Sequence, residues 1–110
     1  MKRLALISVV ALCATAHAEF WDGNKLLEKI NSHLNYEQGM ALGYIMGVAD
    51  TGLGISHCTP ANATAGQLHD MVLIHLRAFP ERRTRTADSI VMETLKAAWP
   101  CQRSNGSRSL

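Results

Sequence analysis

The sequence has little of what β-sheet proteins, membrane proteins and enzymes need. It contains three prolines and three cysteines among 110 residues, and 5% of the residues are aromatic. No stretch alternates apolar and polar residues long enough to predict a strand. It also has no H-E-x-x-H motif, no G-x-S-x-G motif and no phosphate-binding glycine loop. We therefore predict no catalytic residue, no metal site and no cofactor.

A long apolar run is missing as well, and this decides how the N-terminus is interpreted. Lys2 and Arg3 precede an apolar run over 4–14, which the small-x-small sequence AHA follows at 16–18. The run is too short to span a bilayer. The pattern is typical of a secretory signal, so we predict a cleaved signal peptide of residues 1–18 and no membrane insertion of the mature chain.

Removal of the signal changes the size and the charge of the chain. It leaves 92 residues, enough for a single small domain over 19–101. Without Lys2 and Arg3 the eleven basic residues become nine, which equals the nine acidic residues. The formal net charge is then zero, and a nucleic-acid partner is not predicted.

The cysteines divide in the same way. Cys13 leaves with the signal, so Cys58 and Cys101 remain as a pair. An even number of cysteines in an exported protein indicates a disulfide. The alternative is a catalytic thiolate, suggested by His57 beside Cys58, but an exported pair of cysteines usually oxidises.

Apolar residues recur at helical spacing through nearly the whole mature chain. This predicts an all-α domain, a bundle of four to five helices, and a disordered polar tail over 102–110. Thr64 and Gln67 fit a capping box at one helix start. The predicted helices cover 22–34, 36–51, 64–79 and 85–98, with Gly52 and Gly54 ending the second and Pro80 ending the third.

Three glycines lie four residues apart in the second predicted helix, at Gly39, Gly43 and Gly47. Glu37, Asp50 and the short length of the helix exclude a membrane-helix seam. Each glycine costs roughly 1 kcal/mol of helix propensity relative to alanine, so we predict that close packing compensates. The neighbour on this face is another helix of the same chain or a second copy.

Two segments are candidates for binding a partner. The loop PERRTRTAD, residues 80–88, concentrates Arg82, Arg83 and Arg85 between two helices. Its simpler interpretation is a solvated helix connection. The second candidate is 55–63, held by its cysteine and stiffened by a proline, in which His57 is expected to be exposed.

Several segments together resemble a known family. In order they are GYIMGVAD, HCTP, TAGQLHDMVLIHL, FPERRTRTADSIVMETL and AAWPC. This order is similar to the Rap/Tai family of immunity proteins of bacterial type VI secretion, over about Tyr44 to Cys101. The polar tail and the basic segment after Pro80 depart from the family pattern.

The resemblance implies a small helical protein of the periplasm with a disulfide between Cys58 and Cys101. It also implies a homodimer that neutralises a peptidoglycan-cleaving amidase effector by plugging its active-site cleft, and that is not itself an enzyme. The same features fit two alternatives: a periplasmic chaperone of the acid-stress type, and an accessory subunit of an envelope complex.

Overall fold

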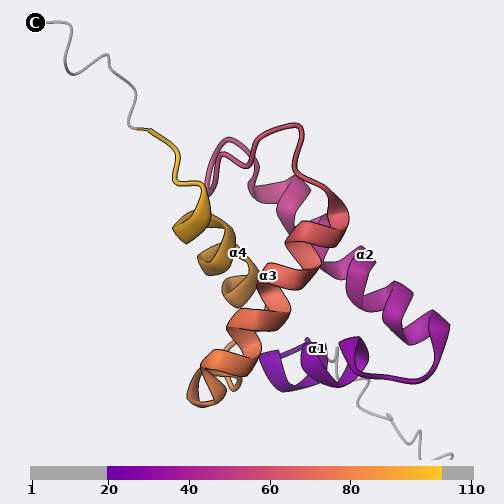
Figure 1. The fold of residues 1–110 in the computed structure, drawn as a ribbon. Helices are drawn as coiled ribbons and strands as arrows, with labels where there is room; N and C mark the ends of the chain where they lie inside the picture. The colour runs from indigo at the N-terminus through magenta and orange to yellow at the C-terminus, as the bar shows by residue number, and fades with distance from the viewer. Residues whose placement is uncertain (1–19, 103–110) are drawn as a thin grey trace, which may run out of the picture.

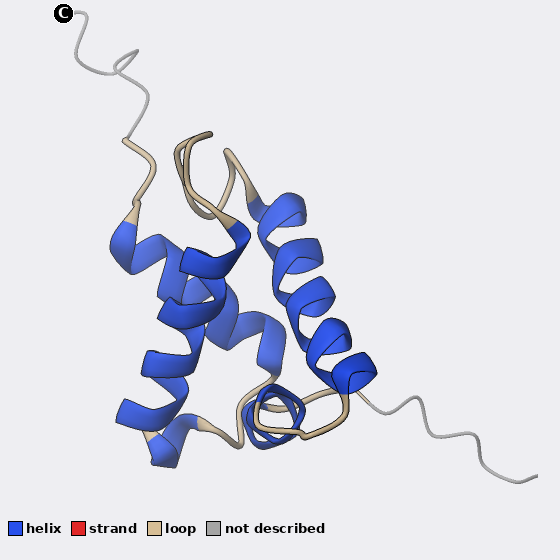
Figure 2. Cartoon of the chain, turned by 45° about the vertical axis from the view of Figure 1, so that its right-hand side comes forward, coloured by secondary structure: helices blue, strands red, loops and turns tan. Residues whose placement is uncertain are grey.

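A computed structural model describes residues 20–102, and within these residues all regular secondary structure is helical (Figure 2). The chain forms α1 (Gly23–Ile30), α2 (Asn35–Gly52), α3 (Ala65–Ala78), a short 3-10 helix η1 (Pro80–Arg82) and α4 (Ala87–Ala98). The predicted all-α bundle is confirmed. The predicted signal peptide over 1–18, and the predicted polar tail apart from Gln102, lie outside the described residues.

The start of α3 follows the predicted capping box. The Thr64 hydroxyl accepts from the Gln67 backbone N–H at 3.1 Å, and the Gln67 side-chain oxygen accepts from the Thr64 N–H at 2.8 Å. The two side chains thus satisfy N–H groups that have no partner inside the helix. At the other end the helix stops at Ala78, because Pro80 cannot continue it and begins η1 instead.

Helix α1 is shorter than predicted, since it ends at Ile30 and not near Leu34. A polar cluster holds the turn that follows. Both Lys29 Nζ and Ser32 Oγ donate to the carboxylate of Glu37 at 2.5 Å, so the turn is bonded to the first turn of α2. The hydrogen bond from Lys29, followed by that from Ser32, lowers the pKa of the Glu37 carboxyl.

The core lies where one face of each α-helix meets the others. Figure 1 shows α3 crossing α4, and α1 lying at the opposite end of the bundle from the connection between α2 and α3. Burying a large aliphatic side chain contributes about 1.5–3 kcal/mol, so this cluster supplies most of the stabilisation. Its members are Leu26, Ile30, Ala41, Ile45, Ala49, Leu68, Val72, Leu76, Ala87, Ile90, Val91 and Leu95.

The N-terminus of α1 packs directly on the backbone of the connection between α3 and α4. The N–H of Gly23 donates to the carbonyl of Arg85 at 3.0 Å, and that of Asn24 to the carbonyl of Arg83 at 3.1 Å. A Cβ at Gly23 would lie 2.6 Å from Ile90 Cδ1 and 2.8 Å from Arg83 Cα. Only glycine fits this approach, because the backbone of Arg83 cannot move aside as a side chain could.

Candidate partner-binding site

The disulfide attaches the segment after α2 to the end of α4. Cys58 and Cys101 are bonded with their Cα atoms 4.8 Å apart, which confirms the predicted pair. The N–H of Cys58 also donates to the carbonyl of Trp99 at 2.8 Å. The chain is therefore held at this point by one covalent bond and one hydrogen bond.

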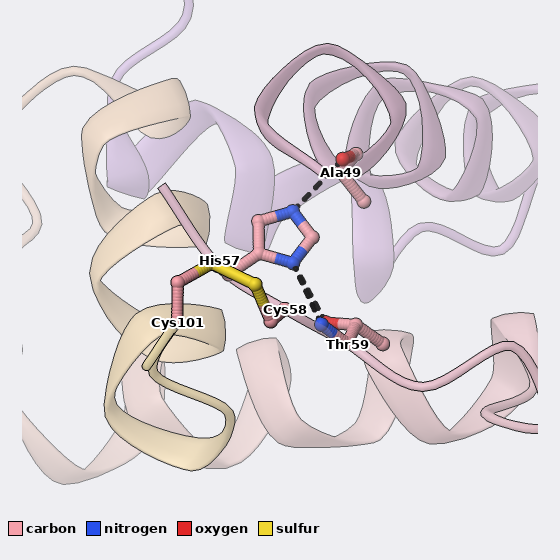
Figure 3. The surroundings of a disulfide bond; sticks show 5 residues. All are labelled: Ala49, His57, Cys58, Thr59 and Cys101. Carbon is pink, nitrogen blue, oxygen red and sulfur yellow. Dashed lines mark hydrogen bonds between the residues drawn. A yellow bond between two sulfur atoms is a disulfide. The ribbon is translucent and has the colours of Figure 1, made fainter. Parts of the chain in front are cut away.

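His57 lies beside the disulfide and is buried, with 1% of its surface exposed. Figure 3 shows its ring between α2 and Thr59, where Nε2 lies 2.8 Å from the carbonyl oxygen of Ala49 and Nδ1 lies 2.7 Å from Thr59 Oγ1. A neutral ring satisfies both contacts, with Nε2–H donating to Ala49 and Nδ1 accepting from the Thr59 hydroxyl. The prediction that His57 is exposed is wrong, because its ring packs under the end of α2 and joins that helix to the cysteine segment.

Between these fixed points the chain makes a tight turn, which we call the 52–57 loop. Helix α2 ends at Gly52, as predicted, but of the two glycines only Gly54, with φ +78°, has the left-handed conformation. The N–H of Gly54 donates to the carbonyl of His57 at 2.8 Å, and that of Ser56 to the carbonyl of Gly52 at 2.8 Å. The loop is thus closed by its own backbone hydrogen bonds.

The 52–57 loop presents apolar side chains to solvent. Ile55 at its tip is 83% exposed and Leu53 is 53% exposed. A hollow of about 470 Å³ separates the loop from α4, lined by Ile55, Ser56, Met92, Glu93, Lys96, Pro100 and Cys101. The sequence indication of this surface was an isoleucine between Gly54 and Ser56, outside any helical stripe.

The arginines of the connection between α3 and α4 have partners within the chain. Arg82 and Arg85 both pair with the carboxylate of Glu93, at 2.9 and 3.0 Å, and the Arg82 guanidinium lies 4.6 Å from the centre of the Phe79 ring. Arg83 donates from Nε to the carbonyl of Leu76 at 2.6 Å and so caps the end of α3. Sequence reasoning missed Glu93, the residue that organises Arg82 and Arg85. Partner binding by these arginines stays a prediction.

The glycine face of α2 is open. A Cβ built at Gly39, Gly43 or Gly47 meets nothing within 4 Å. The prediction that another helix of the same chain packs closely on these glycines is therefore wrong within residues 20–102. The face of α2 that packs in this chain is the one bearing Ala41, Ile45 and Ala49. The second copy stays a prediction.

Beside this face a hollow of about 350 Å³ separates α2 from α4. Its lining consists of Gly43, Tyr44, Gly47, Val48, Thr51, Asp88 and Met92. Tyr44 stacks on Trp21, with ring centres 5.0 Å apart. Burial, and then the charge of Asp88, raises the pKa of the Tyr44 phenol. Side chains of α2 and α4 line the sides of this hollow, and it extends to the backbone of α2 at Gly43 and Gly47, which have no side chain.

The described residues bring together no group of three or more His, Cys, Asp or Glu side chains that could hold a metal ion. No helix within 20–102 has both the length and the apolar character needed to cross a membrane. The exposed features of this part of the chain are the apolar 52–57 loop beside the disulfide, the glycine face of α2 and the arginines of the connection between α3 and α4. Residues 20–102 thus form a small disulfide-bonded helical domain.

Residues 10–101 match the sequence model of the Rap1a immunity proteins, and the chain belongs to this family. No curated protein matches the chain. Membership makes the chain an immunity protein and not an enzyme, and it implies a cognate toxin as the partner. The disulfide agrees with a location outside the cytoplasm, where thiols oxidise.

Proposed function

We propose that this immunity protein acts in the periplasm, where it binds and inhibits a peptidoglycan-degrading amidase effector of a type VI secretion system. The observation that carries the proposal is the family match over residues 10–101. The amidase target comes from the resemblance of the segments between Tyr44 and Cys101 to the Rap/Tai family. The Cys58–Cys101 disulfide and the signal pattern over 1–18 support the periplasmic location.

Inhibition of this kind requires a stable contact surface on the immunity protein and no chemical reaction. A binding protein gains affinity when its contact residues are already held in the bound conformation, because less ordering entropy is lost on association. The described domain meets this condition, since a disulfide and the buried His57 hold the segment after α2. The inhibitor therefore blocks access to the amidase cleft and leaves both proteins chemically unchanged.

The experiment is a peptidoglycan digestion assay, and the proposal predicts that the amidase it requires is encoded beside the gene of this protein. The purified mature chain should abolish release of peptidoglycan fragments at about one inhibitor per enzyme, because a complex whose dissociation constant is far below the assay concentration forms stoichiometrically. A matched control is the same protein added to an unrelated amidase, which should stay active. Continued digestion at excess immunity protein would refute the proposal. Capture of many unrelated client proteins at acid pH would favour the chaperone instead.

The periplasmic location has its own test in cells that export the amidase. The full chain should protect these cells from lysis, whereas a chain lacking residues 1–18 should not, because it stays in the cytoplasm. Equal protection by both forms would contradict a periplasmic site of action.

The homodimer belongs to the same proposal, with the glycine face of α2 as its contact. Gly43 and Gly47 allow a partner backbone to approach closely, and the exposed side chains of Tyr36, Met40 and Leu42 extend the apolar surface along α2. The variant Gly43→Leu should shift the protein from dimer to monomer in sedimentation without loss of helix. Ala97→Leu, at an exposed alanine of α4 that lines a hollow without any residue of α2, is the control and should leave the dimer intact. A monomeric wild-type protein would refute the dimer.

A further inference from the structure

The 52–57 loop has the properties of an interface anchor. Ile55 exposes 83% of its surface at the tip and Leu53 exposes 53%, so this short loop presents two large apolar side chains to solvent. The backbone beneath it is not free to collapse and bury the side chain. Gly54 N–H donates to the carbonyl of His57, and both Ile55 and Ser56 N–H groups donate to the carbonyl of Gly52.

Both ends of the loop are fixed to different helices. At its start, Gly52 packs so closely on α4 that a Cβ there would lie 2.5 Å from the sulfur of Met92. At its end, buried His57 bonds to Ala49 of α2, and the adjacent Cys58 is bonded to the end of α4. A projecting apolar side chain on a backbone held in this way loses little entropy on binding, as anchors at tight interfaces do.

The charge beside the loop identifies the kind of recess that fits it. Glu93 lines the hollow between the loop and α4, and two arginines, Arg82 and Arg85, already neutralise it. Lys96 lines the same hollow, is exposed, and makes no ion pair with any residue in 20–102. The α4 side of the loop therefore carries excess positive charge, which is complementary to an acidic rim, whereas the exposed carboxylate of Asp50 lies on the side of Leu53 and His57.

We propose that the 52–57 loop inserts Ile55 into an apolar recess of the cognate toxin, with Lys96 pairing to a carboxylate on the rim of that recess. This inference rests on the proposed function for the identity of the toxin as an amidase. The proposed main contact is then at the C-terminal end of α4 and not at the arginine connection. The arginine connection leads into the start of α4, whereas the N–H of Cys58 donates to the carbonyl of Trp99, just after the end of α4. Arg82 and Arg85 then act by cancelling the charge of Glu93.

The test compares two exposed isoleucines on different surfaces. Ile55→Asp should weaken binding to the catalytically inactivated amidase by about thirtyfold or more, the loss expected for an interface anchor. Ile74→Asp is the matched control, since Ile74 is 66% exposed on α3 and lines a hollow that shares no residue with the one beside Ile55. It should change the dissociation constant by less than about threefold. Both variants should keep the wild-type melting temperature, because neither side chain is buried in the fold.

A charge variant tests the acidic rim separately. Lys96→Glu should slow association, and the difference from wild type should shrink as salt is raised, because charge complementarity acts mainly on the encounter rate. Unchanged binding by Ile55→Asp would overturn the inference. The proposed function would stand in that case, provided that the wild-type protein binds and inhibits the amidase. A change of oligomeric state in Ile55→Asp at unchanged toxin affinity would overturn it as well, by assigning the loop to a contact between copies. Failure of the wild-type protein to bind the amidase would overturn both.

Discussion

Removal of the Cys58–Cys101 disulfide should cost the domain a large share of its stability. The cysteines lie 43 residues apart in sequence, so the bond closes α3, η1 and α4 into one loop. In the chain-entropy model, a loop of this length restricts the unfolded chain by about 4 kcal/mol at 25 °C. Small domains have only about 5–15 kcal/mol of stability in total. We expect Cys58→Ser/Cys101→Ser to lower the free energy of unfolding by about 4 kcal/mol and the melting temperature by about 20 °C.

The folded state should change little, which locates the effect in the unfolded chain. Cys58 is exposed and Cys101 is half-buried, so the serine hydroxyls can be hydrated. The hydrogen bond from the Cys58 backbone to Trp99 does not depend on the sulfur atoms. The measurement is urea unfolding followed by far-ultraviolet circular dichroism. The midpoint should fall, and the m-value should rise, because the released chain exposes more surface when it unfolds.

Two controls separate the bond from the substitution. Wild-type protein treated with a reductant should unfold at the same urea concentration as the double serine variant, and the oxidised wild type should unfold at a higher one. A loss below about 1 kcal/mol would refute the loop-entropy argument, because it would mean that the unfolded chain is already restricted without the bond. A large loss with an unchanged m-value would instead locate the stabilisation in the folded state.

Three further predictions concern the fold. Gly23→Ala should destabilise the domain by about 2 kcal/mol, since its Cβ meets backbone, whereas Gly39→Ala, with open space around it, should stabilise the monomer by up to about 1 kcal/mol; thermal melts of the two variants compare these directly. Thr64→Ala should cost about 1 kcal/mol in urea unfolding through loss of the capping box, and an unchanged midpoint would contradict this cost. Hydrogen bonding to Lys29 lowers the pKa of Glu37 in the folded state. This carboxylate therefore contributes stability that is fully present above its unfolded pKa and is lost as the pH falls through its folded pKa. The variant Glu37→Gln should reduce the loss of stability at acid pH in a plot of the free energy of unfolding against pH.

Local rules predicted the parts of the fold that depend on neighbours in sequence. The capping box of Thr64 and Gln67 and the end of α3 before Pro80 follow from backbone groups within one turn. The disulfide followed from counting, since only Cys58 and Cys101 lie outside the predicted signal peptide. The length of α1 was missed, because the contacts of Glu37 that stabilise the turn after Ile30 join residues five to eight positions apart across two elements.

The candidate site was less predictable, because exposure is a property of the packed molecule. Arg82 and Arg85 are basic residues in a loop by sequence, and the structure pairs both with Glu93, a residue of α4 eight to eleven positions away. Ile55 stood inside a predicted binding segment, but the backbone bonds that hold its side chain outward join Gly52 and His57 across the turn.

Residue spacing along the chain predicted an all-helical domain, its capped helix, its disulfide pair and its likeness to an immunity family. Which faces of the helices are covered depends on how the helices pack. The packing buried His57 under the end of α2, left Gly39, Gly43 and Gly47 open, and placed Ile55 at the surface. The physical reason is that helical periodicity predicts that a helix has an apolar face, whereas only the packing of several helices selects which neighbour covers it.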